Sequence, residues 1–159
     1  MSIFTKQRGV SLIELLIVIA IIILLALVSI FALNSQYAKA RDAKRISDIR
    51  QIRTALEFYK SDEGQYPIEA NPIVLGSKEK SKLCSKNSGG FVPADTVCKE
   101  ETNYMSKVFA DPLAGRNYLY TGSADGFDIT FTTERASNLG LPGTYHAHSQ
   151  TIDSISGNN

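Results

Sequence analysis

Few side chains in this 159-residue sequence are of types and spacings that could do chemistry. The candidates are two cysteines, Cys84 and Cys98, two histidines, His146 and His148, and one glutamate, Glu14, near the start of an apolar run. No nucleophile motif, phosphate-binding loop, C-x-x-C or H-E-x-x-H is present. We therefore expect no catalytic residue and a protein that is not an enzyme.

The two histidines of the sequence are candidate metal ligands. At i, i+2 on a strand, His146 and His148 would share a face. Two imidazoles without a nearby cysteine or acidic partner make a weak metal site, so we expect no metal there.

Glu14 lies at the beginning of a long apolar stretch. From Leu15 to Leu33, 19 residues in a row include only one polar side chain, that of Ser29. As a helix this run would span about 28 Å, close to the thickness of a hydrocarbon core. It predicts a transmembrane segment, placed at residues 12–33. An isolated carboxylate at its edge is costly unless it finds a partner or reaches the interface.

A short basic leader, M-S-I-F-T-K-Q-R-G, precedes the apolar run, and Glu14 is the fifth residue after Gly9. This pattern closely resembles the processing site of the type IV pilin and type II secretion pseudopilin superfamily. The resemblance implies that a prepilin peptidase cuts between Gly9 and Val10 and methylates Val10, and that Glu14 acts in assembly. Two positions differ from the usual pattern: Val10 replaces Phe or Met, and Phe31 stands where the family often has proline.

An ordinary secretory signal is the competing interpretation of the first 40 residues. Ala38-Lys39-Ala40 has the small-x-small form of a signal-peptidase site, but the apolar run exceeds the usual core of about 7–15 residues and contains Glu14. The mature chain would start at Val10 on the first interpretation and at Arg41 on the second.

The orientation in the membrane is ambiguous from charge alone. Basic residues follow the apolar run as well as precede it, and their count would put the C-terminal side in the cytoplasm. Long domains translocate with little regard to charge, and the family resemblance and the paired cysteines place the C-terminal domain outside the cytoplasm. We expect a single-pass protein of the cell membrane that ends in an extracellular or periplasmic filament.

The helix is expected to continue past the membrane segment. No Gly or Pro interrupts residues 10–63, and apolar residues then recur at steps of three and four, at Ile46, Ile49, Ile52, Leu56 and Tyr59. This pattern predicts one long helix, apolar all round and then amphipathic, that packs on protein with one face.

Basic residues at 41–53 could suggest nucleic-acid binding. Asp42 and Asp48 interleave with them, and the net charge is only +1, so we interpret the cluster as a solvated helix face or a subunit contact and expect no nucleic-acid partner.

The remaining residues predict a small head domain. The stretch A-L-E-F-Y-K-S-D-E-G-Q-Y-P at 55–67 resembles the end of the long helix in major pseudopilins, with Gly64 and Pro67 ending it. Residues 68–110 are expected to be irregular apart from a short helix at 103–109, residues 117–121 and 127–133 to form a hairpin, and residues 144–147 a strand. The rest of the tail is expected to lie on the surface or to be disordered.

Together these features predict an α+β, pilin-like fold in which the long helix packs on a small antiparallel sheet. The domains expected are a leader (1–9), the helix (10–63) and the head (64–159). Cys84 and Cys98 fit one disulfide in an exported domain. The resemblance also raises calcium, for which Asp125, Asp128 and Glu134 are candidate ligands; a dense acidic loop is lacking, so no cofactor is expected.

The function expected is that of a structural subunit of a helical filament, a type IV pilus or a type II secretion pseudopilus. The resemblance implies as partners other copies of the chain, a prepilin peptidase, an inner-membrane assembly platform and, before assembly, membrane lipid. A minor pilin or membrane-anchored binding module, active in adhesion or DNA capture, is the alternative.

Overall fold

The computed structural model describes residues 11–99 and 102–154, and within this part the side chains of residues 30–33 are not described. The chain divides into two compact units, residues 1–37 and residues 38–159, the second of which we call the head unit. Helix α1 runs from Leu12 to Glu63 and contributes to both units. The prediction of one long helix is confirmed, although Gly9 and Val10 lie outside the described residues.

In the first unit, α1 is apolar on all sides and exposed. By length and composition this part of the helix could cross a membrane, and none of its apolar window is buried within the described structure. Exposed apolar surface of this extent is unfavourable in water. These side chains therefore need an apolar partner from outside the described part of the chain.

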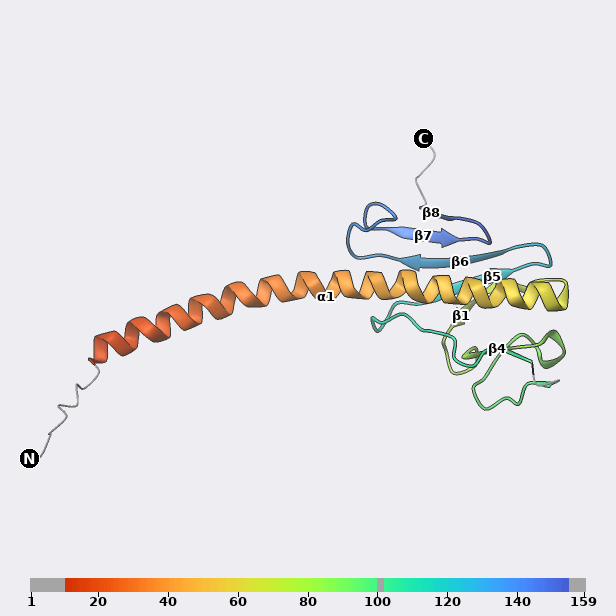
Figure 1. Cartoon of the computed structure of the whole chain (residues 1–159), viewed down its shortest axis with the longest axis horizontal. Coiled ribbons are helices and arrows are strands. Elements are labelled where there is room, and N and C mark those ends of the chain that lie inside the picture. Colours follow the sequence, from red (N-terminus) through yellow and green to blue (C-terminus); the bar gives the residue numbers. More distant parts are fainter. Residues whose placement is uncertain (1–10, 100–101, 155–159) are drawn as a thin grey trace, which may run out of the picture. The chain divides into compact units, whose positions relative to one another are not determined.

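The head unit contains two antiparallel sheets (Figure 1). The larger has the strand order β1-β5-β6-β7-β8, and the smaller has the order β3-β2-β4. A short 3-10 helix, η1 (Lys86–Ser88), follows β2. The strands are β1 (Glu69–Leu75), β2 (Lys82–Cys84), β3 (Phe91–Val92), β4 (Asn103–Met105), β5 (Tyr118–Gly122), β6 (Phe127–Thr132), β7 (Thr144–Ala147) and β8 (Ile152–Ser154).

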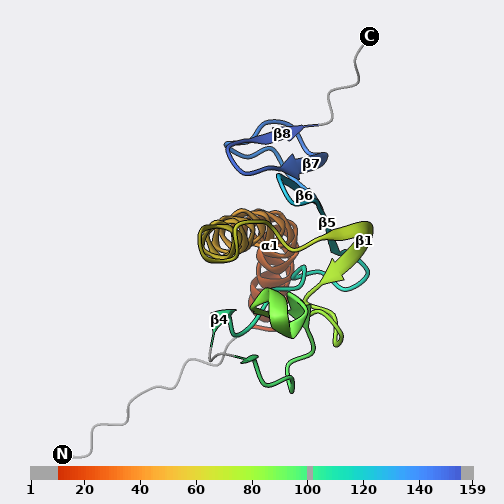
Figure 2. The ribbon, with the colours of Figure 1, turned by 90° about the vertical axis from the view of Figure 1, so that its right-hand side faces the viewer.

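The apolar stripe of α1 packs on the larger sheet, as predicted. Ile49, Ile52 and Leu56 are fully buried, and they share one core with the inward side chains of β5 and β6, such as Tyr120 and Ile129. Figure 2, which looks along the helix, shows this sheet curving past one side of α1 within the head unit. The α+β architecture is therefore confirmed.

The predicted hairpin and the strand at 144–147 are present. Strands β5 and β6 pair antiparallel with Gly122 opposite Phe127, and β7 pairs with β6 and continues the sheet. The tail adds β8 beyond β7, which the sequence did not indicate.

Two expectations for residues 68–110 are wrong. Residues 103–105 form strand β4, not a helix, because they pair with β2. The segment is also less irregular than expected, since it contributes the edge strand β1 and the three short strands of the smaller sheet. Pro72 and a register irregularity between Glu69 and Ile73 remove the alternation that would have marked β1, and strands of two or three residues are too short to show a period.

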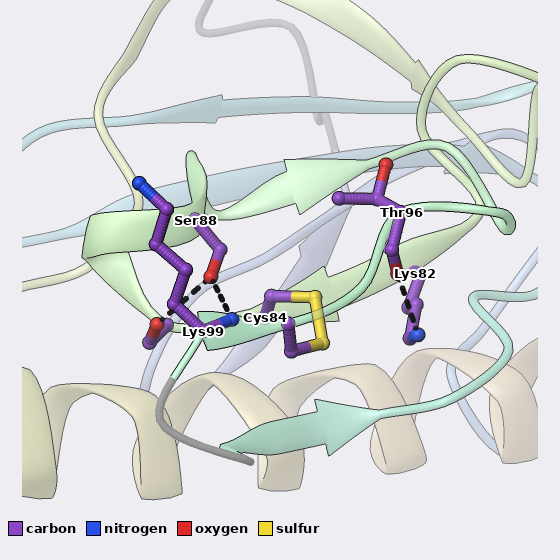
Figure 3. Close-up of a disulfide and its surroundings, with 7 residues drawn as sticks. Lys82, Cys84, Ser88, Thr96 and Lys99 are labelled. Atoms are coloured by element: carbon purple, nitrogen blue, oxygen red, sulfur yellow. Dashed lines mark hydrogen bonds between the residues drawn. A yellow bond between two sulfur atoms is a disulfide. The ribbon is translucent and has the colours of Figure 1, made fainter.

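The disulfide between Cys84 and Cys98 is present, as predicted, with the two Cα atoms 5.3 Å apart. Two further contacts hold the loop that it closes (Figure 3). The Ser88 hydroxyl accepts the N–H of Lys99 at 2.7 Å, and Lys82 Nζ donates to the carbonyl oxygen of Thr96 at 2.9 Å. A long connection with little regular structure is thus fixed at three points.

We predict that replacing both cysteines by serine lowers the free energy of unfolding by roughly 3 kcal/mol, because the bridge closes a loop of about 15 residues in the unfolded chain. Denaturant unfolding of the detergent-solubilised chain, followed by near-ultraviolet circular dichroism of its tyrosines, measures the change. Reducing agent should destabilise the parent protein and leave the double variant unchanged. Two alkylatable thiols in the exported, non-reduced protein would contradict the bridge.

Candidate functional site

Glu14 lies in the first turn of α1 and is exposed. The N-terminal end of a helix favours a negative charge, which makes this a suitable place for a carboxylate. Among the described residues, none donates a hydrogen bond to the Glu14 side chain. Its partner, in any environment without water, must therefore come from outside the described part of this chain.

Ser29, the other polar side chain of the apolar segment, differs in this respect. Its hydroxyl donates to the carbonyl oxygen of Leu25 at 2.8 Å, one turn earlier in the same helix. A hydroxyl satisfied in this way needs no outside partner in lipid or in a protein interior. Glu14 is thus the group in the described apolar segment that must find one.

The head unit contains a cluster of charged side chains, centred on Arg45. This side chain has no exposed surface, and its guanidinium binds three carboxylates. Arg45 makes a two-bond fork to Asp111, at 2.7 and 2.8 Å, and its Nη1 donates to both Asp42 and Glu134 at 2.7 Å. The fork geometry of arginine matches a carboxylate in two bonds, which a lysine could not do.

These carboxylates attach two loops to the helix. Asp111 precedes β5 and also accepts the N–H of Leu113, whereas Glu134 follows β6 and receives a second fork from Arg41, at 2.7 and 2.8 Å. Asp42 accepts the backbone N–H groups of Glu134 and Arg135. One turn of α1 thus fixes both ends of the β5–β6 hairpin.

Another acidic residue of the helix, Asp48, lies next to this cluster. It pairs with Lys44 at 3.0 Å and accepts a hydrogen bond from the Tyr118 hydroxyl at 3.3 Å. Burial raises the pKa of Tyr118, and the charge of Asp48 raises it further, so that the hydroxyl remains a donor.

The hydrogen bonds of the cluster keep Arg45 and Glu134 ionised. Burial alone would lower the pKa of Arg45, but the hydrogen bonds to Asp111, Glu134 and Asp42 raise it above its ordinary value. The hydrogen bond from Arg41, together with those from Arg45, lowers the pKa of Glu134 to about 2 against the effect of burial. At neutral pH Arg45 and Glu134 are therefore both charged, and each has a partner of opposite charge.

The interpretation of the charged residues at 41–53 as a solvated face or a subunit contact is thus wrong for three of them. Arg45, Asp42 and Asp48 are buried within the head unit. A signal was available in the sequence: Arg45 lies four residues before Ile49 and seven before Ile52, in line with the apolar stripe. An arginine at a stripe position, with an aspartate three residues earlier, indicates a buried ion pair.

The calcium candidates do not converge. Glu134 is held by two arginines, while Asp128 lies 2.8 Å from Nδ1 of His146. Within residues 11–99 and 102–154, no group of three or more His, Cys, Asp or Glu side chains is placed to hold a metal ion. His146 and His148 share a face of the sheet, as expected, with their ring centres 6.3 Å apart.

Comparison with known proteins adds two findings. Residues 4–30 match the model of the prokaryotic N-terminal methylation motif. The chain is also 29% identical over 138 residues to the type II secretion system core protein G of Klebsiella michiganensis, an alignment that covers 87% of this chain and 88% of that protein. No solved structure matches the chain significantly.

We predict that Arg45→Met destabilises the head unit by roughly 3–5 kcal/mol, because it leaves buried carboxylates without their counter-charge. Arg50→Met is the matched control: Arg50 is an exposed arginine of the same helix, and its loss should change stability by less than about 0.5 kcal/mol. Denaturant unfolding of both variants in detergent measures the difference. Equal stability of the two would mean that the cluster does not hold the hairpin to the helix.

The lowered pKa of Glu134 predicts a specific acid dependence. In the unfolded chain this group titrates near its ordinary pKa of 4.5, and in the folded protein near 2. Its contribution to stability is therefore complete above pH 4.5 and is lost as the pH falls from there towards 2. Glu134→Gln should be less stable at neutral pH and should lose less stability over this pH range. Parallel acid titrations of the two proteins would contradict the assignment.

Proposed function

We infer that this chain, a member of the type IV pilin and type II secretion pseudopilin superfamily, is a structural subunit of a helical filament that a prepilin peptidase processes. The observation that carries the inference is the apolar segment of α1, which directly follows a methylation motif and receives no cover within the described structure. Proteins of this family have a structural role, and we propose no enzymatic role for this chain.

Processing at the N-terminus comes first in the proposed sequence of events. The peptidase removes residues 1–9 by cutting after Gly9 and then methylates the amine of Val10. The motif match at residues 4–30 supports this assignment, because it spans both positions. Methylation leaves the amine positively charged.

The apolar segment then has two successive environments. Before assembly, lipid covers the exposed side chains from Leu12 to Val28, and the segment anchors the protein in the membrane. During assembly, the same segments of neighbouring copies replace lipid as cover and form the core of the filament. An inner-membrane assembly platform would extract each subunit, and the disulfide supports a head outside the cytoplasm, since such bridges persist in oxidising compartments.

Glu14 is the residue that we assign to assembly. It lies four residues after Val10, a separation that corresponds to a rise of about 6 Å in an α-helix. In a filament core without water both charges need partners, and the methylated amine of one subunit can pair with Glu14 of its neighbour.

The comparison favours the secretion pseudopilus over the pilus, since the relative is a core protein of the type II secretion system. The alternative of a minor pilin or binding module is less well supported. The similarity extends over 87% of the chain, so it includes the head as well as the anchor. A head adapted to another task would be expected to differ there.

We predict that Glu14→Ala is processed normally and remains in the membrane but fails to assemble, because a buried methylated amine then lacks its partner. Ser29→Ala is the control and should assemble, since its hydroxyl is satisfied within its own helix. Immunoblots of the membrane and sheared fractions measure both. Parent-level filament yield from Glu14→Ala, at equal protein level, would overturn the role of Glu14 in assembly.

A further inference from the structure

The head part of α1 also has an exposed side, which forms a ridge. We call it the α1 ridge and define it by Ser47, Arg50, Gln51, Thr54 and Phe58, all of which are exposed. Figure 2 shows that strands flank the head part of α1 without enclosing it. Phe58 has 63% of its surface exposed, which is unusual for a phenylalanine next to a well-packed core.

Two hollows border this ridge and share Arg50 and Thr54. The apolar hollow, of about 380 Å³, is also lined by Phe58 of the ridge and by Tyr104 and Met105. The cationic hollow, of about 390 Å³, is lined by Arg50 and Arg53 with Thr54, Glu57 and Ser149. An apolar half and a basic half thus lie next to each other on one surface.

The cationic hollow contains an unmet hydrogen-bond donor. Arg53 donates through Nη2 to the carbonyl oxygen of Ser149 at 2.6 Å, but its Nε is buried and has no acceptor among the described residues. Glu57, whose carboxylate accepts the hydroxyl of Tyr66 at 2.9 Å, is not that acceptor. An unmet donor is costly, so a carboxylate brought next to the Arg53 guanidinium is favoured.

We propose that the α1 ridge and its two hollows receive a second copy of this chain, whose Asp95 pairs with Arg50 and Arg53 and whose Val97 enters the apolar hollow. This inference rests on the proposed filament. In a filament of identical subunits a contact joins two different patches of the same chain, so a basic patch requires an acidic one elsewhere on it. A free anion would use only the cationic half of the surface.

The loop at 93–99 offers both groups. Val97 is 85% exposed, the largest exposure among the big apolar side chains described, and Asp95 is an exposed carboxylate two residues earlier. The loop is also held in place by the disulfide and by the bond from Lys82 to the carbonyl of Thr96. A segment fixed in advance loses less entropy when it binds.

Charge reversal tests the surface in the full-length chain. Arg50→Glu should lower the filament yield about tenfold, the size expected when a contact charge pair becomes repulsive. Lys78→Glu is the matched control, because it makes the same charge change at another exposed position of the head, and its yield should stay within about twofold of the parent. Thermal unfolding of both variants checks that the fold is retained.

The partner segment is tested by a charge swap. Arg50→Glu combined with Asp95→Lys should restore the yield to near that of the parent, whereas Asp95→Lys alone should lower it. A photoreactive amino acid placed at Thr54 should give an adduct of two chains, cross-linked to the peptide that contains Asp95 and Val97.

The outcomes separate this inference from the proposed function. If the parent chain forms no filament, the proposed function itself fails. If the parent assembles and Arg50→Glu assembles equally well, the α1 ridge is not a subunit contact. If the charge swap fails and the adduct maps to another peptide or another protein, Asp95 and Val97 are not the partner.

Discussion

The constraint on which the rest of this structure depends is an apolar helix segment that its own chain does not cover. From Leu12 to Val28 the large apolar side chains are about half exposed or more. Burial of apolar surface is worth roughly 25 cal/mol per Å², so leaving a segment of this size exposed to water is strongly unfavourable. Lipid and the same segment of other copies are both apolar, so either could cover it, as the proposed function requires.

Because the apolar segment is committed to outside partners, the head unit must be stable by its own contacts. It achieves this by using the second part of α1 as a component of its core, with Ile49, Ile52 and Leu56 against the larger sheet. Arg45 fixes how the β5–β6 hairpin lies on the helix. Its guanidinium pairs with three carboxylates, one from the helix and two from the loops before β5 and after β6. A buried charge tolerates displacement less well than an apolar contact does.

Much of this arrangement could be predicted from the sequence. The long helix, the apolar stripe, the hairpin and strand β7 all have a period that extends over enough residues to be recognised. Strands β1 to β4 could not, since β1 lacks a clear alternation, β2 to β4 have only two or three residues each, and no local pattern marks their pairing partners. The Arg45 cluster joins positions up to 93 residues apart, and the sequence marks only its local part, the spacing of Asp42 and Arg45.

The mass of the intact chain in the sheared filament fraction tests whether this protein is a processed filament subunit. We expect a filament-forming chain that starts at Val10, carries one added methyl group and retains the Cys84–Cys98 bridge. A chain that starts at Arg41 would show that an ordinary signal peptide had been removed together with the apolar segment. That result, or a chain that retains residues 1–9 and occurs only in the membrane, would contradict the account.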